Sequence, residues 1–206
     1  MTSFDFNSTK NKKFAELIGI ILGDGCIMDY KNHKELKITL HSKDDVSYSK
    51  YIERLFFDLF QLEIKRYLRK NENTLDLRIV NKKLIKFLLD DLGLISSPKR
   101  RRAKIPNKFM KYGLDALRGY FDTDGSLVIT NNNGTVYPRI EMKICDSPMQ
   151  EQFILLLKKA GFRFGVYNLA NRAVRLQLNG KDQLNRWIRL VGPKNTKHLN
   201  KLNILS

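Results

Sequence analysis

A nine-residue stretch occurs twice in this chain, and its duplication constrains the fold more than any other feature. The stretch Leu17-Ile18-Gly19-Ile20-Ile21-Leu22-Gly23-Asp24-Gly25 returns 100 residues later as Leu117-Arg118-Gly119-Tyr120-Phe121-Asp122-Thr123-Asp124-Gly125. Each copy is an apolar run that ends in an acidic residue and a glycine. Asp-Gly between apolar runs is also a hairpin signal. Two copies in register, each preceded by a helical pattern, favour two equivalent helices over turns.

The apolar residues of the first copy have the period of a helix. An amphipathic helix carries apolar residues at i, i+3, i+4 and i+7, which is the spacing of Phe14, Leu17, Ile18 and Ile21. Gly19 and Gly23 share one face of this helix, as Gly119 and Thr123 do in the second copy. A glycine inside a helix costs about 1 kcal/mol relative to alanine, and a close helix–helix contact would offset that cost. We therefore expect the two helices to pack side by side.

Two acidic residues stand at the expected helix ends. Gly25 and Gly125 occupy the place where a helix end favours a left-handed residue. Asp24 and Asp124 then lie at helix C-termini, the negative end of the helix dipole. Two carboxylates brought together there repel each other unless cations intervene. The pattern predicts a site for a hard, oxygen-liganded divalent cation, Mg²⁺ with Mn²⁺ as a substitute.

Both copies resemble the signature of the LAGLIDADG homing endonucleases, in the single-chain form that carries two motifs. Position eight of that signature, the metal-binding acid of the family, is Asp24 in the first copy and Asp124 in the second. Position six is Leu22 in the first copy and Asp122 in the second. That position is not the essential acid of the family, so the difference is interpreted as asymmetry between the halves.

The resemblance implies a metal-dependent endodeoxyribonuclease, a phosphodiester hydrolase that breaks both strands of a specific DNA site across the minor groove. The expected metal ligands are Asp24 and Asp124, with the carbonyl groups of Gly23 and Thr123 as additional ligands by resemblance. A Lys-x-Ile-Pro block precedes the second motif in the family. Here Lys104 directly precedes Ile105-Pro106, one residue out of that register, and Lys104 is the third catalytic candidate.

The charge of the chain indicates the class of its partner. Thirty-eight basic residues oppose 21 acidic ones, which gives a net charge of +17 and a pI near 9.9. Such a field favours a polyanion, and no long basic amphipathic helix suggests a membrane surface. Cys26 and Cys145 have no metal-ligand spacing, and the simplest interpretation is two buried thiols in a reducing compartment. With no apolar signal region, the expected location is the cytoplasm or an organelle that encodes the protein, not the secreted fraction.

The residues at the two ends of the chain differ from those typical of inteins. Inteins resemble one another in a Cys or Ser start and a His-Asn end, whereas this chain starts with Met1 and ends Asn-Ile-Leu-Ser. We expect a free-standing, intron-encoded protein that acts as a monomer.

The order of predicted elements repeats as helix, strand, strand, helix, strand, strand, helix. The predicted fold is α+β, a pseudo-twofold duplication of an αββαββα unit. Its two four-stranded antiparallel sheets form a DNA-binding saddle, with the motif helices at the central interface. The halves are residues 1–94 and 108–206, joined by a basic linker at 95–107. This linker is either solvated or clamps DNA phosphates.

Helix limits are also predicted. The motif helices are expected at about Lys10–Gly23 and Lys108–Thr123, and a third helix at Lys82–Leu92. Side chains of Asp44 or Asp45, and of Ser147, are expected to cap the helices that follow them.

The expected strands alternate apolar and polar residues, so each sheet should have one buried and one polar face. Polar side chains on such a face pair with base edges in the major groove, although plain solvent exposure is the common alternative for any single strand. Their recurrence, together with the net charge, favours double-stranded DNA with a long, partly asymmetric target site. The candidate contacts are Lys37, Thr39, His41, Lys65, Tyr67, Arg69, Asp76, Arg78, Arg139, Glu141, Lys143, Arg175, Gln177 and Asn179.

Two other functions remain open at this point. One is an RNA-binding intron maturase on the same fold, since some proteins of the family both cut DNA and assist splicing. The other is a DNA-binding regulator without activity. Intact acids in both copies argue against the regulator, because a pure binder has no need to hold two repelling carboxylates.

Overall fold

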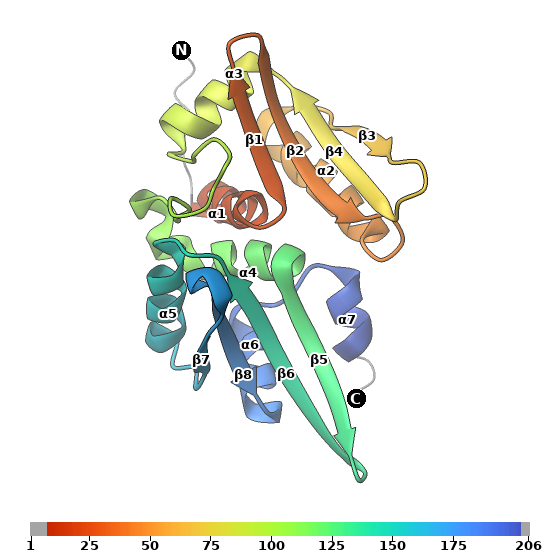
Figure 1. The fold of residues 1–206 in the computed structure, drawn as a ribbon, viewed down its shortest axis with the longest axis vertical. Helices are drawn as coiled ribbons and strands as arrows, with labels where there is room; N and C mark the ends of the chain where they lie inside the picture. Colours follow the sequence, from red (N-terminus) through yellow and green to blue (C-terminus); the bar gives the residue numbers. More distant parts are fainter. Residues whose placement is uncertain (1–7, 203–206) are drawn as a thin grey trace.

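Two similar units of helices and strands are stacked on each other in the computed structural model, which describes residues 8–202 (Figure 1). The ends of the two predicted halves, residues 1–7 and 203–206, lie outside the described residues. No helix among residues 8–202 is long and apolar enough to cross a membrane.

The first unit has the predicted order of elements. It contains α1 (Ser8–Leu22), β1 (Gly25–Tyr30), β2 (His33–His41), α2 (Val46–Phe60), β3 (Lys65–Leu68), β4 (Thr74–Val80) and α3 (Lys82–Lys86), followed by a π-helical turn (Phe87–Asp91). The helix expected at Lys82–Leu92 thus changes its hydrogen bonding halfway along, and the chain leaves it through the left-handed Gly93.

The second unit repeats the order and adds a helix. A 3₁₀ helix (Asn107–Tyr112) leads into α4 (Gly113–Asp124), β5 (Gly125–Asn132), β6 (Thr135–Ile144), α5 (Met149–Lys159), β7 (Gly165–Asn168), a short 3₁₀ turn (Ala170–Arg172), β8 (Val174–Asn179), α6 (Lys181–Leu190) and α7 (Thr196–Leu202). The sequence pattern did not indicate α7.

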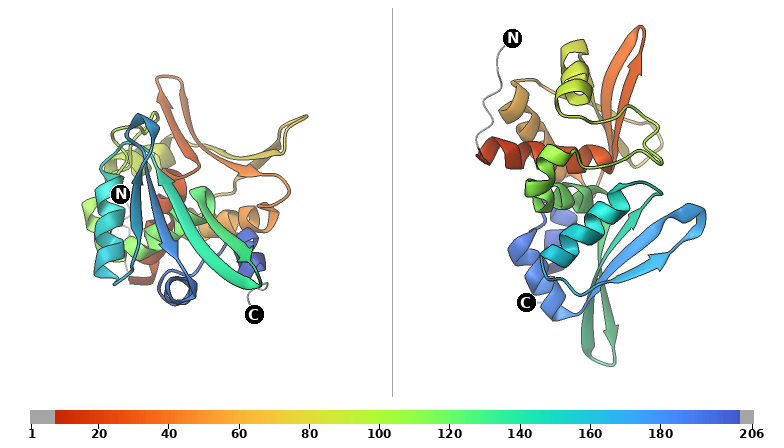
Figure 2. Two further views of the ribbon diagram at one scale, coloured as in Figure 1. Left: turned by 60° about the horizontal axis from the view of Figure 1, so that its bottom comes forward. Right: turned by 90° about the vertical axis from the view of Figure 1, so that its left-hand side faces the viewer.

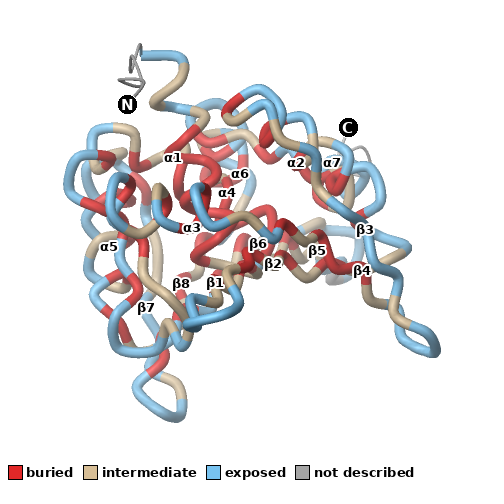
Figure 3. The backbone as a smooth tube through the Cα atoms, turned by 90° about the horizontal axis from the view of Figure 1, so that it is seen from above, coloured by how far each residue is buried: buried red, intermediate tan, exposed pale blue. Residues whose placement is uncertain are grey.

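Each unit contains one four-stranded antiparallel sheet, and the predicted fold class is confirmed. The strand orders are β1-β2-β4-β3 and β5-β6-β8-β7, so the second sheet repeats the first. The helices lie on one side of the two sheets and leave the opposite faces open (Figures 2 and 3). The motif helices α1 and α4 lie against each other between the units (Figure 1).

Alternation along the strands separates the core from the open faces. In β2, Leu36, Ile38 and Leu40 are buried, whereas Lys37 and Thr39 are half-buried on the other face. The buried side chains of both units join one continuous hydrophobic cluster that includes α1 and α4. The polar faces of the two sheets are therefore held in a fixed relation by a shared core.

Gly25 and Gly125 do not adopt the left-handed conformation expected of them. Gly125 has φ −89° and ψ 165°, and both residues begin strands. A Cβ at Gly25 would lie 2.5 Å from the Cα of Ile21, and one at Gly125 would lie 2.8 Å from the Cα of Phe121. Glycine is needed here because the strand starts directly against the last turn of its own helix.

The expected helix caps are also absent. Asp45 precedes α2, but its side chain makes no capping hydrogen bond to that helix. Its carboxylate instead accepts from the backbone N–H of His41 and from Asn195. The Ser147 hydroxyl donates to the carbonyl of Cys145 and does not cap α5. Cys145 is exposed and Cys26 is half-buried, so the expectation of two buried thiols is wrong.

Candidate active site and nucleic-acid interface

The site is built where α1 and α4 cross. A Cβ on Gly19 would overlap the carbonyl oxygen of Ala116, and a Cβ on Gly119 would overlap that of Glu16. The two helix backbones therefore touch at these glycines, as the small-residue face predicted. The sequence spacing of motif glycine and motif acid then brings the C-terminal ends of both helices to the same place.

A buried ion pair fixes this crossing. Arg118 on α4 donates to the carboxylate of Glu16 on α1 over 2.8 Å and to Asp115 over 2.9 Å. The Tyr51 hydroxyl donates to the other Glu16 oxygen over 2.8 Å. Removing the Arg118 charge would leave the buried Glu16 carboxylate without its opposite charge, which is costly. The network therefore favours one register of the two helices over neighbouring ones.

Asp24 and Asp124 meet at the C-terminal ends of the motif helices. A Cβ added at Gly23, next to Asp24, would lie 3.4 Å from the Asp124 Oδ2. Burial, and then the negative charge of Asp124, raise the pKa of Asp24 to about 7. Desolvation by the surrounding protein raises the pKa of Asp124 as well, although Asp124 is more exposed than Asp24. Two carboxyl groups in this condition attract cations.

Two lysines lie beside these carboxyl groups, and neither was predicted from the sequence. The Lys99 ammonium donates to the carbonyl oxygens of Ile21 over 2.9 Å and Leu22 over 2.7 Å, and also contacts that of Gly23. The Lys197 ammonium lies 3.3 Å from the carbonyl oxygen of Thr123. Each motif helix thus ends against one ammonium group, and the charges of both lysines oppose the rise in the pKa of Asp124.

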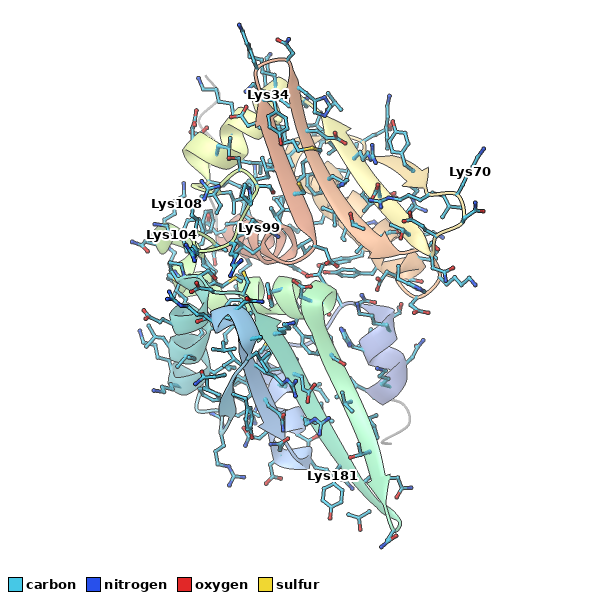
Figure 4. All side chains as sticks on the ribbon, in the orientation of Figure 1. Lys34, Lys70, Lys99, Lys104, Lys108 and Lys181 are labelled. Carbon is cyan, nitrogen blue, oxygen red and sulfur yellow. The ribbon has the colours of Figure 1, made fainter. Side chains whose placement is uncertain are left out.

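Lys104, the lysine chosen from the sequence, lies elsewhere. Lys104 is exposed on the linker, whereas Lys99 on the same linker lies between the two units (Figure 4). Burial lowers the pKa of Lys99, and the nearby Asp124 and Asp24 oppose that fall. The structure therefore places Lys99, not Lys104, at the carboxyl pair. The only sequence signal for Lys99 is its place in a basic run, and that signal does not separate it from its neighbours.

The oxygen atoms at this place fit a divalent cation. The two carboxylates are hard ligands of the kind that Mg²⁺ takes. The carbonyl oxygens of Gly23 and Thr123 are of the same kind, but in this structure they accept from Lys99 and Lys197, whose ammonium groups would have to move aside for these oxygens to bind a metal. Within residues 8–202, no group of three or more His, Cys, Asp and Glu side chains could hold a metal by itself. Mg²⁺ commonly uses one or two carboxylates and completes its shell with water and substrate phosphate oxygens. The residues present fit that kind of site.

The open face of the first sheet carries the predicted side chains in cross-strand rows. Lys37 on β2 is opposite Arg78 on β4, which is opposite Lys65 on β3. The neighbouring row is Thr39, Asp76 and Tyr67. His41 ends β2, where its ring Nδ1 lies 3.0 Å from a carboxylate oxygen of Asp44. The result is a basic, aromatic surface on the sheet that begins directly after Asp24.

Asp76 differs from the other expected DNA contacts because it is fully buried. Its carboxylate accepts from Thr39 over 3.0 Å, from Arg69 over 3.0 and 3.1 Å, and from Arg78 over 2.8 Å. Those bonds lower the pKa of Asp76 although burial opposes them. Arg78 also lies over the ring of Tyr67, 5.1 Å from its centroid. Asp76 thus lies on the open face, where the two guanidinium groups that it holds cover it.

The open face of the second sheet has a different set of groups in the same arrangement. Glu141 on β6 is opposite Gln177 on β8, and Lys143 is opposite Arg175, which is opposite Tyr167 on β7. Arg139, opposite Asn179, forms an ion pair of 2.6 Å with Glu141, and Gln177 donates to Asn179 over 2.9 Å. Because the two faces differ at equivalent positions, they present different chemistry to the two sides of a ligand.

Comparison of the sequence with known proteins finds a distant relative. No family model matches the sequence. An uncharacterized protein of Methanocaldococcus jannaschii is 22% identical over 162 residues, which are 78% of this chain and 59% of that protein. This chain thus spans about three fifths of the relative's length.

The fold of this chain is similar to the folds of several solved homing endonucleases. A structure of mesophilic variants of the homing endonuclease I-DmoI has a TM-score of 0.62 and 17% identity, over 90% of this chain and 97% of that chain. The homing endonuclease I-WcaI bound to its DNA recognition sequence has a TM-score of 0.62 and 19% identity, over 90% and 83%. The LAGLIDADG meganuclease I-AabMI bound to uncleaved DNA has a TM-score of 0.60 and 14% identity, over 89% and 86%.

Proposed function

We propose that this chain, which has the fold of the single-chain LAGLIDADG homing endonucleases, is a divalent-metal-dependent endonuclease that cuts both strands of a specific DNA site. One observation carries the proposal. The crossing of α1 and α4 joins the two units, and it brings Asp24 and Asp124 together with raised pKa values. A protein that only bound DNA would gain nothing from this unfavourable pair.

Asp24 and Asp124, with the carbonyl groups of Gly23 and Thr123, would hold the metal ions. Bound divalent metal lowers the pKa of water and stabilises the charge on a leaving phosphate oxygen. Structures of I-DmoI with DNA include complexes with Mn and with Ca, and one obtained in the presence of Mg, which supports Mg²⁺ with Mn²⁺ as a substitute here.

The lysines add positive charge where a phosphate would lie. Lys99 and Lys197 each end on one motif helix beside the carboxyl pair. Their ammonium groups would attract the negative charge that develops on a phosphate during hydrolysis, an effect that is strong in a site closed from water. Each half of the site would therefore have one ammonium group at the end of its motif helix.

The open faces of the two sheets would bind DNA on both sides of this centre. Arginine pairs best with guanine, and glutamine or asparagine with adenine. The basic, aromatic first face and the mixed second face therefore support a long, asymmetric target. Both motifs lie in one chain, so one copy would form a complete site and act as a monomer. As in homing enzymes, we propose that an intron encodes it.

A cleavage selection tests the proposal and identifies the target in the same experiment. A pool of duplex DNA with a randomised segment is incubated with the protein and Mg²⁺, and cut ends are captured and sequenced. We expect one family of related sequences, cut at a fixed position on both strands, and no cut ends in EDTA. Random nicking, or cutting that persists in EDTA, would contradict the proposal.

A further inference from the structure

Asp122, at position six of the second motif, lies in a contact that the first motif lacks. Its side chain is fully buried, and its Oδ2 accepts from the backbone N–H of Lys194 over 2.8 Å. The backbone carbonyl of Asp122 accepts from the Asn195 side chain over 2.8 Å. Leu22, the residue at the same position of the first motif, is buried in the hydrophobic core. The difference between the motifs thus coincides with the place where residues 194–202 meet the protein.

Asn195 extends this contact to the other half of the molecule. It is fully buried, and the same amide group donates to Asp45 Oδ1, before α2, over 2.7 Å. Its side-chain oxygen accepts from the backbone N–H of Lys197 over 3.0 Å. His198, which follows Lys197, stacks on Phe121 with ring centroids 4.4 Å apart. Residues 194–198 are therefore fixed to both halves.

The consequence of this docking is the position of Lys197. Its ammonium group lies 3.3 Å from the Thr123 carbonyl oxygen and 3.3 Å from Asp45 Oδ1. Lys99 reaches the first motif by a different route, on the linker, where the N–H of Ser97 donates to the carbonyl of Ile27 over 2.9 Å. Each lysine thus follows the last helix of its repeated unit, but different contacts hold the two segments in place.

We propose that Asp122 is a positioning residue, which docks the segment 194–202 and thereby holds Lys197 at the second motif. The proposal rests on the nuclease function proposed above. It gives a structural role to the acid at position six of the second motif, where the first motif has Leu22. Because the buried carboxylate of Asp122 accepts from the N–H of Lys194, it anchors the start of the segment 194–202. Loss of this anchor would disturb one side of the active site and leave Lys99, on the other side, in place.

The test compares the two DNA strands within one reaction. Asp122→Leu, which gives the second motif the residue of the first, is assayed in single turnovers at saturating Mg²⁺ and DNA, with each strand carrying its own label. Because a small misplacement of a catalytic group has a large cost, we expect cleavage of one strand to slow at least about tenfold. The other strand should change less than about threefold. DNA affinity, measured in Ca²⁺, should stay within about threefold of wild type.

Three further variants separate positioning from a general loss of structure. Asp122→Asn keeps an oxygen that accepts from the Lys194 N–H, so it should restore the rate. Lys197→Met should slow the same strand. Asn200→Ala, on the exposed surface of α7, should match wild type.

A readout without DNA or metal tests the docking by itself. In Asp122→Leu, the peptide that contains residues 194–202 should exchange its amide hydrogens faster than in wild type, while peptides from α1 should not change. Unchanged exchange, equal slowing of both strands, or an Asp122→Asn variant as slow as Asp122→Leu would overturn the proposal. If Asp122→Leu does not fold, Lys197→Met provides the test. An unchanged ratio between the cleavage rates of the two DNA strands in Lys197→Met would then overturn the proposal. A wild-type protein that cuts no DNA would instead contradict the nuclease function.

Discussion

The backbone of Gly19 packs directly against the carbonyl oxygen of Ala116, with no room for a methyl group between them. This contact sets the distance between the two motif helices. The acids at the ends of those helices are separated from the crossing by one turn and a fraction, so their relative position depends on it. The same sequence feature thus determines the packing of the units and the geometry of the site.

Alanine at Gly19 is expected to separate the helices. The new Cβ would overlap backbone atoms that cannot rotate away, and overpacking of this kind costs about 3 kcal/mol. Chemical unfolding should therefore show a lower free energy of unfolding for Gly19→Ala. Lys12→Ala, at an exposed position of the same helix, is the control and should stay within about 0.5 kcal/mol of wild type. Equal stability of Gly19→Ala and wild type would show that α1 and α4 do not touch at this glycine.

The Glu16–Arg118 ion pair gives a second prediction. Arg118→Met leaves the Glu16 carboxylate buried without its partner and should cost about 3–5 kcal/mol. Glu16→Gln in the same chain removes the stranded charge and should recover much of that loss. A double-mutant cycle by urea unfolding measures this coupling. Additive losses would mean that the pair contributes nothing to the interface.

The structure places Lys99 beside the carboxyl pair, whereas the sequence indicated Lys104. Lys99→Met removes an ammonium group from the carboxyl pair and should lower the single-turnover cleavage rate about a hundredfold. Lys104→Met removes an exposed charge from the same linker and should lower it less than about threefold. The selected target, at saturating protein, is the substrate for both variants. The reverse order of effects would favour Lys104 as the catalytic lysine.

The raised pKa of Asp24 predicts how stability changes with pH. The folded protein holds this proton up to about pH 7, whereas the unfolded chain releases it near pH 3.8. The folded state therefore binds more protons between these values, and rising pH lowers the free energy of unfolding through this group. Asp24→Asn removes the ionisation, so in EDTA its stability relative to wild type should rise by on the order of 2 kcal/mol between pH 4 and pH 8. A difference that does not change with pH would show that the pKa is not raised.

Asp76 should act through the two arginines that it holds. Asp76→Ala frees Arg69 and Arg78 from their fixed orientation, so guanine pairs that depend on them should weaken by about 1–3 kcal/mol each. Competition binding in Ca²⁺, with single-base variants of the target, would show reduced discrimination on one side of the site. Glu141→Ala is the matched variant in the second sheet and should affect the other side. Unchanged discrimination by Asp76→Ala would separate Asp76 from DNA recognition.

Much of the fold followed from local patterns. Alternation predicted one buried face for each sheet, because burial on one face requires a period of two. Leu36 in β2 and Met142 in β6 lie on such buried faces. The repeat of the motif indicated that two helices are equivalent, and the glycine positions indicated how closely they pack. These are properties that a residue and its near neighbours determine.

Other features depend on contacts between distant segments and left no local pattern. Lys99 and Lys197 reach the site from the linker and from α7, far along the chain from the acids they accompany. Asp76 alternates like an outward residue, but two arginines cover it. Gly25 was expected in a left-handed turn because a helix end favours one, whereas contact with Ile21 is what requires glycine there.

The central claim is that Asp24 and Asp124 share divalent ions at one site, and their replacement tests it most directly. Asp24→Asn and Asp124→Asn keep the size of the side chain and remove its charge. Each is assayed on the selected target for DNA binding in Ca²⁺ and for double-strand cleavage in Mg²⁺. We predict near wild-type binding and no double-strand cleavage by either variant. Full cutting by either one would contradict the account.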